Sequence, residues 1–167
     1  MKGKNITLIG MPGSGKSTIG IRLAEKRGMG FVDTDQLIEA LQGRALQQLV
    51  DGLGTEEFLD LEGKTLLGLS CENTVIAPGG SCIYRDAAME HLKELGLVVY
   101  LKLPYEEVEQ RIHNLDSRGI TFRPGESLRD LYEERTPLYE RYADLTVETC
   151  GLTPEESADR VERALPL

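Results

Sequence analysis

The residues with the clearest chemistry are 10–17, which read GMPGSGKS. They fill every fixed position of the phosphate-binding pattern G-x-x-x-x-G-K-[ST], between an apolar run and a helical pattern, which is the context that this motif requires. The glycines let backbone N–H groups turn toward phosphate oxygens, Lys16 supplies a cation, and the Ser17 hydroxyl is placed to bind Mg²⁺. The alternative, a tight turn with an incidental Lys-Ser, is disfavoured by the flanking elements. The residues predicted to bind the phosphates of a nucleoside triphosphate are Gly13, Ser14, Gly15, Lys16, Ser17 and Thr18.

A pair of acidic residues, Asp33 and Asp35 in the sequence DTD, follows the next apolar run. Alternate residues at the end of a strand point the same way, so both carboxylates can face the phosphate loop. One can assist Mg²⁺, and the other can orient an acceptor hydroxyl and take its proton. The alternative for Asp33 is a helix N-cap, which satisfies free backbone N–H groups. In a chain of 167 residues, this pair favours a small-metabolite kinase over the larger nucleotide-hydrolysing machines.

These residues must be positioned by short β-rich runs that alternate with longer helical patterns. We expect strands at residues 5–9, 31–33, 74–77, 97–103 and 145–148. We expect helices from the phosphate loop to Arg27, at 34–41, 45–50, 85–95, 127–142 and 153–165, and from near Thr55 and Pro104. This alternation predicts an α/β fold with a parallel sheet covered by helices on both faces. Three strand ends carry GMPGSGKS, DTD and PGGS, so these stretches should meet at the edge where such sheets bind ligands.

Composition and charge narrow the class of partner. The formal net charge is −9 at pH 7. A surface this acidic would repel nucleic acid and anionic lipid, and we therefore expect neither as a partner. No apolar stretch approaches the roughly 20 residues that span a bilayer. The three cysteines are widely spaced and show no metal-ligand pattern. We expect one domain over residues 1–167, present as a cytoplasmic monomer with reduced thiols.

An ordered set of motifs resembles the shikimate kinase family. The set comprises GMPGSGKST, FVDTD, GTEEF with Glu62, PGG, an Arg-Pro at 123–124, and R-x-P-L-Y from Arg135, and it covers nearly the whole chain. The resemblance implies a P-loop kinase fold, with a five-stranded parallel sheet flanked by helices. It also implies substrate-binding helices at about residues 34–70 and a mobile lid at about residues 114–126. The implied cofactors are ATP and Mg²⁺, and the implied acceptor is shikimate.

The resemblance also assigns roles to the matching side chains. It implies Lys16, Asp35 and Arg123 as catalytic residues, Ser17 and Asp33 at the metal, Arg118 and Pro154 at the nucleotide, and Asp35, Glu62, Gly79, Gly80 and Arg135 at the acceptor. An arginine on a closing loop suits phosphoryl transfer, which spreads negative charge over the equatorial oxygens. A guanidinium suits a carboxylate, because the two groups are planar and pair through two parallel hydrogen bonds.

Two departures from the family pattern concern the acceptor. Leu59 stands where the family has a second carboxylate-binding arginine, and Ser81 stands at the third glycine of its G-G-G. Without that arginine Glu62 lacks a cation, and an uncompensated carboxylate in a pocket is costly. A substrate ammonium bound by Glu62 or Asp60 would compensate it, which makes a hydroxylated amino acid such as homoserine the alternative acceptor. If another cation such as Arg85 takes the missing place, shikimate remains the acceptor.

A different class of function is a degenerate kinase that binds nucleotide and regulates a partner. Such proteins usually lose the phosphate-loop lysine, the metal-binding hydroxyl or the catalytic acid. This chain keeps all of these groups, which are Lys16, Ser17, Asp33, Asp35 and Arg123. We therefore expect an ATP-dependent enzyme.

Overall fold

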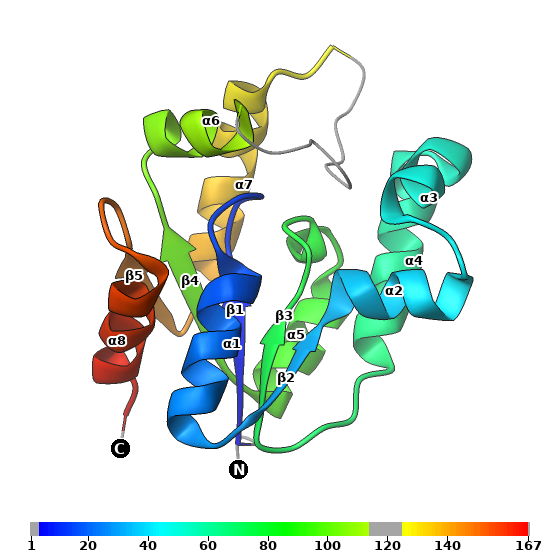
Figure 1. Cartoon of the computed structure of the whole chain (residues 1–167). Coiled ribbons are helices and arrows are strands. Elements are labelled where there is room, and N and C mark those ends of the chain that lie inside the picture. The colour runs from blue at the N-terminus through cyan, green and yellow to red at the C-terminus, as the bar shows by residue number, and fades with distance from the viewer. Residues whose placement is uncertain (1–3, 114–124, 167) are drawn as a thin grey trace.

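The computed structural model describes residues 4–113 and 125–166, and at its centre lies a parallel β-sheet (Figure 1). The strands are β1 (Asn5–Ile9), β2 (Gly30–Asp33), β3 (Thr74–Ala77), β4 (Gly96–Lys102) and β5 (Leu145–Glu148). They lie in the order β2-β3-β1-β4-β5, and each neighbouring pair is parallel. The predicted fold class, a five-stranded parallel sheet flanked by helices, is confirmed.

Helices connect and cover these strands. They are α1 (Lys16–Arg27), α2 (Thr34–Gln42), α3 (Leu46–Leu53), α4 (Thr55–Leu67), α5 (Asp86–Leu95), α6 (Tyr105–His113), α7 (Leu128–Tyr142) and α8 (Pro154–Ala164), with a short 3₁₀ helix η1 (Cys82–Tyr84). Their ends lie within a few residues of the predicted ones, because the signals at the ends are local. The Ser127 hydroxyl, for example, accepts the backbone N–H of Asp130 at the start of α7. Within the two described ranges, no helix is both long and apolar enough to cross a bilayer.

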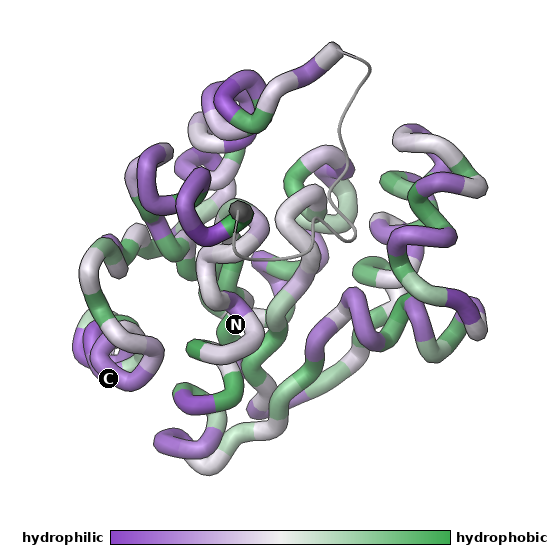
Figure 2. Tube along the Cα trace, turned by 45° about the horizontal axis from the view of Figure 1, so that its top comes forward, coloured by the Kyte–Doolittle hydropathy of each residue, from purple (hydrophilic) through white to green (hydrophobic). Residues whose placement is uncertain are grey.

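The central strands are buried on both faces, as expected for a parallel sheet with helices on each side. Successive side chains point to opposite faces, so Leu8 and Val99 pack with α1 and α8. Ile9 and Tyr100 lie on the opposite face, in an apolar cluster with α5 and α7. Figure 2 shows the central strands largely apolar and the surrounding helices mixed, which is typical of helices that bury one face.

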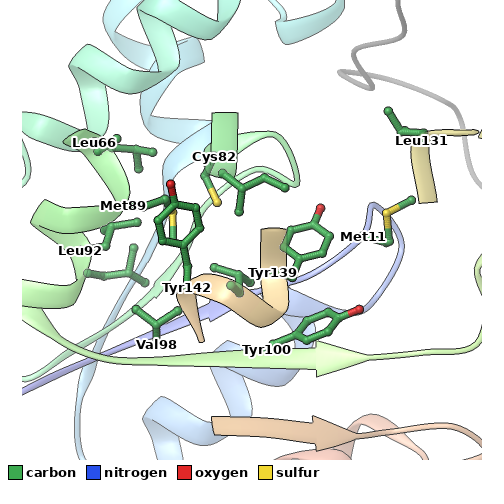
Figure 3. Packing of buried hydrophobic residues seen from close by; sticks show 14 of the residues in the cluster. Met11, Leu66, Cys82, Met89, Leu92, Val98, Tyr100, Leu131, Tyr139 and Tyr142 are labelled. Atoms are coloured by element: carbon green, nitrogen blue, oxygen red, sulfur yellow. The ribbon is translucent and has the colours of Figure 1, made fainter. Parts of the chain in front are cut away.

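The second of these clusters fixes α7 against the sheet. Tyr139 and Tyr142 of α7 lie beside Tyr100 of β4, together with Met89 of α5 (Figure 3). The rings of Tyr100 and Tyr139 stack with their centroids 5.1 Å apart. Arg135 lies one helical turn before Tyr139, so this packing determines where its guanidinium points.

The helices α2, α3 and α4 stand to one side of the carboxyl edge of the sheet, with α6 on the other side (Figure 1). The helices α2, α3 and α4 share a small apolar cluster of Ile38, Leu46, Leu49 and Phe58. Leu66 of α4 belongs to the apolar cluster that contains Ile9 and Tyr100, and it therefore connects this group of helices to the core. The predicted substrate-binding segment, residues 34–70, contains all three helices. Most of the predicted lid, residues 114–124, lies outside the described residues.

Candidate active site

The phosphate loop joins β1 to α1 and ends in a glycine that the backbone requires. Gly15 precedes α1 with φ 90°, a left-handed conformation that side chains disfavour. Lys16 Nζ donates hydrogen bonds to the carbonyl oxygens of Gly10 and Met11, at 2.9 Å each. The ammonium group is therefore held across the loop at the N-terminus of α1, where an anion is stabilised by free N–H groups.

Asp33 has two partners, one for each carboxylate oxygen. Oδ1 accepts the backbone N–H of Asp35 at 2.9 Å and that of Gln36 at 3.2 Å, so Asp33 is the N-cap of α2. Oδ2 accepts the hydroxyl of Ser17 at 2.6 Å. The capping and metal-binding interpretations are thus compatible. A hydroxyl and a carboxylate in contact fit Mg²⁺, which uses few protein ligands and completes its octahedron with water and phosphate oxygens.

Asp35 lies in the first turn of α2, with its carboxylate directed toward the loop after β3. Its Oδ1 lies 2.7 Å from the place that a Cβ on Gly79 would occupy, so a side chain at that position would displace it. Burial raises the pKa of Asp35 to about 6, and the nearby charge of Asp33 acts in the same direction. Burial also lowers the pKa of Lys16 to about 8. Asp35 therefore has the acidity of a general base that works near neutral pH.

Glu62, on α4, is the second carboxylate beside Gly79 and is only 2% exposed. Its Oε1 accepts the hydroxyl of Ser81 at 2.7 Å, whereas Oε2 has no hydrogen-bond partner among the described residues. Oε2 lies 2.6 Å from the place of a Cβ on Gly79. Burial and the charge of Asp35 raise the pKa of Glu62 to about 7. Two buried carboxylates thus meet at one glycine.

Arg135 is 1% exposed, so its guanidinium points into the protein and not into solvent. Its Nε donates to the Tyr84 hydroxyl at 3.2 Å, and its Nη1 lies 3.1 Å from the place of a Cβ on Gly80. Tyr139 donates its hydroxyl to the Gly80 carbonyl at 2.5 Å. The structure therefore brings the predicted Arg135, Gly79 and Gly80 together with Asp35 and Glu62.

The surroundings of Leu59 correct two sequence-based expectations. Arg85 Nε pairs with Asp60 at 2.9 Å and Nη2 pairs with Glu56 at 3.1 Å, so Arg85 does not replace the missing arginine. Asp60 is engaged in that ion pair, and its side chain is 62% exposed. Of the two acids considered for a substrate ammonium, Glu62 is the one inside the site. Leu59 itself is buried at 1% exposure.

The other predicted nucleotide residues differ in their exposure. Thr18 is exposed in the first turn of α1, and Pro154 is exposed at the start of α8. Ser14 is fully buried, and its backbone N–H donates to the Met11 carbonyl at 3.1 Å, so the structure does not support it as a phosphate contact. Arg118 and Arg123 lie outside the described residues.

Sequence analysis missed Arg111, on α6. Its Nη1 donates to the Gly13 carbonyl at 3.2 Å, and its Nη2 pairs with Glu107 at 2.7 Å. The Glu107–Arg111 spacing of four residues is visible in the sequence as a helix-surface pair. That spacing does not show that the pair borders the phosphate loop, because the two segments are 98 residues apart.

Replacing Glu62 by glutamine should stabilise the protein at pH 8 by about 2–3 kcal/mol, because a raised folded-state pKa means that ionising Glu62 opposes folding. The penalty is absent below the unfolded pKa of 4.5, grows as the pH rises, and is complete above about 7. Urea denaturation at pH 8 and pH 5 measures the difference, which should fall at pH 5 to about a quarter of its value at pH 8. The exposed Glu25→Gln is the matched control, and a Glu62→Gln variant less stable than wild type at pH 8 would contradict this account.

The chain is similar to known proteins over most of its length. Residues 12–166 match the family model for shikimate kinase. The chain is 35% identical over 161 residues to a shikimate kinase of Thermodesulfovibrio yellowstonii, covering 95% of this chain and 92% of that protein. It is 38% identical over 162 residues to threonine synthase-like 1 of Mus musculus, covering 95% of this chain but 22% of that protein.

Among solved structures, a shikimate kinase from Acinetobacter baumannii in complex with shikimate matches with a TM-score of 0.85 and 33% identity, covering 96% of this chain and 92% of that chain. These similarities confirm the predicted class of enzyme, an ATP-dependent small-molecule kinase. The chain belongs to the shikimate kinase family.

Proposed function

We propose that this protein transfers the γ-phosphoryl group of ATP to a hydroxyl of a small, carboxylate-bearing metabolite, with shikimate as the reference acceptor. The observation that carries the proposal is the convergence of Asp35 and Arg135 on the Gly79–Gly80 loop, beside Lys16. This arrangement offers a base for a hydroxyl and a cation for a carboxylate next to a phosphate loop. Shikimate is the ligand of the solved relative, and it has both groups.

In this proposal, the phosphate loop binds the nucleotide. The backbone N–H groups of Gly13 and Gly15 would contact the phosphates, and Lys16 would exchange its carbonyl partners for phosphate oxygens. Mg²⁺, when bound between Ser17 and Asp33, would neutralise part of the phosphate charge. Arg111 would border the nucleotide from α6, with Thr18 and Pro154 farther out.

The acceptor would be oriented from the opposite side. Arg135 would bind its carboxylate, and the N–H groups of Gly79 and Gly80 would fix its orientation. Asp35 would accept the hydroxyl proton while the acceptor oxygen forms a bond to the γ-phosphorus and the bond to the ADP oxygen breaks. Arg123 and Arg118 would supply positive charge from the lid. Each step requires only positioning and charge, which these side chains provide.

Phosphorus NMR of the purified protein with ATP, Mg²⁺ and shikimate tests the proposal directly. We expect a phosphomonoester signal to grow at the rate at which ADP appears, and Lys16→Met should abolish both. ADP released without a phosphomonoester would show hydrolysis instead. ATP binding with no turnover of any hydroxy acid or hydroxy amino acid would favour the regulatory alternative.

The rate should depend on pH in a bell shape when both substrates are well below their KM. Asp35 must be ionised to accept a proton, so the rate should fall below about pH 6. Lys16 must be protonated to bind phosphate, so the rate should fall again above about pH 8. A stopped assay from pH 5 to 9, with the concentration of magnesium-bound ATP held constant, measures the profile. A rate that stays flat from pH 5 to 7 would exclude Asp35 as the base.

A further inference from the structure

The acceptor site contains more negative charge than a hydroxy acid requires. Asp35 Oδ1 and Glu62 Oε2 lie 2.7 and 2.6 Å from the same point above Gly79. Of these two carboxylates, the proposed reaction uses only Asp35, as the base for the acceptor hydroxyl. Glu62 is therefore a buried carboxylate that the proposed reaction leaves without a function.

Ser81 holds Glu62 in one orientation with one oxygen left over. The Ser81 hydroxyl donates to Oε1 at 2.7 Å, and Oε2 is buried with no hydrogen-bond partner among the described residues. A buried acceptor without a donor is destabilising unless a ligand supplies one. Both departures from the family pattern noted above therefore concern Glu62. Leu59 stands where the family has an arginine that could neutralise this carboxylate, and Ser81 donates to it a hydrogen bond that carries no charge.

Protein cations compensate Glu62 only in part. Lys16 donates to two phosphate-loop carbonyls, and Arg85 is paired with Asp60 and Glu56. The charges of Arg135 and Lys16 act to lower the pKa of Glu62, yet it stays raised to about 7. A further positive charge at Oε2 would therefore be stabilised by the site as it stands.

We propose that Glu62 Oε2, with Asp35 beside it, binds an ammonium group of the acceptor, and that the preferred acceptor is an α-amino acid with a side-chain hydroxyl. This inference rests on the proposed kinase activity and specifies its substrate class. Arg135 would bind the carboxylate, Glu62 the ammonium and Asp35 the hydroxyl. Both oxygens lie within 2.7 Å of one point, so they are close enough together for a single ammonium, with hydrogen bonds of about 2.8 Å, to bridge them from the open side of Gly79.

A matched pair of acceptors isolates the ammonium. L-homoserine and 4-hydroxybutyrate share a carboxylate and a terminal hydroxyl, and differ only in the amino group. In the wild-type protein we expect kcat/KM for L-homoserine to exceed that for 4-hydroxybutyrate by roughly 10- to 100-fold, the range for a hydrogen bond to a charged group. It should also exceed kcat/KM for shikimate.

Two variants test whether Glu62 is responsible. The Glu62→Gln variant should fold, because it removes a buried charge. In this variant the ratio of kcat/KM for L-homoserine to kcat/KM for 4-hydroxybutyrate should fall toward one. The control Glu25→Gln should keep the ratio of the wild-type protein. Leu59→Arg should lower kcat/KM for L-homoserine and raise it for shikimate, because it returns a cation to Glu62.

The outcomes separate this inference from the proposed function. If shikimate is phosphorylated and L-homoserine is used no better than 4-hydroxybutyrate, the ammonium site is wrong and the kinase assignment stands. A preference for L-homoserine that persists in Glu62→Gln also overturns the site. If no acceptor yields a phosphomonoester, the proposed function itself fails.

Discussion

Asp35→Asn is expected to lower kcat by roughly 10²- to 10⁴-fold, the range for loss of a positioned general base. Asparagine preserves the shape of the side chain beside Gly79 but cannot accept a proton from the acceptor hydroxyl. The KM for ATP should change little, because the phosphate loop and the Ser17–Asp33 contact remain. Stability should not fall, since burial already opposes ionisation of Asp35.

Initial rates of phosphomonoester formation at pH 7.5 measure this effect. The matched control is Asp51→Asn, which changes an exposed aspartate of α3 in the same group of helices. A kcat for Asp35→Asn within threefold of wild type would show that another group takes the proton.

Arg135→Lys is expected to reduce kcat/KM for the acceptor by roughly 10- to 100-fold, with an effect of about 1.5–3 kcal/mol for a charge-assisted contact to a carboxylate. Lysine keeps the positive charge but loses the planar fork that matches a carboxylate. It also loses the Nε–H that donates to Tyr84. The change should appear in the KM for the acceptor rather than in the KM for ATP.

Steady-state kinetics with each substrate varied in turn separate these two parameters. Arg141→Lys, at an exposed position of the same helix, is the control and should behave as wild type. An unchanged acceptor KM in Arg135→Lys would remove Arg135 from the acceptor site, and thermal denaturation checks that both variants are folded.

Sequence reasoning predicted the sheet and the phosphate loop well because their signals are local. Buried strands such as β4 are continuous apolar runs, and the ends of α7 and α8 carry capping residues that satisfy nearby N–H groups. The phosphate loop is a contiguous motif, so its residues could be named before the fold was known. The approach of the DTD stretch to the phosphate loop also followed from the rule that parallel strands end at one edge, and Asp33 accepts the Ser17 hydroxyl there.

The contacts around Gly79 and Gly80 were predicted less completely, because they join distant segments. Ser81 was noted only as a departure, yet it bonds to Glu62, 19 residues away. Tyr84 was not considered, although it accepts from Arg135 across 51 residues. Arg85 was a reasonable substitute for the missing cation until its ion pairs with Asp60 and Glu56 were visible. Such pairings depend on helix packing, which residue spacing alone does not determine.

The central claim is that strand ends carrying Lys16, Asp35 and the Gly79–Gly80 loop surround one alcohol next to one nucleotide. A crystal structure with ADP, Mg²⁺ and the acceptor that is turned over tests it most directly. We predict ADP phosphates on the loop at Lys16, the acceptor carboxylate on Arg135, and the reacting hydroxyl about 2.6–3.2 Å from Asp35. A hydroxyl directed away from Asp35, or a nucleotide bound elsewhere than this loop, would contradict the account.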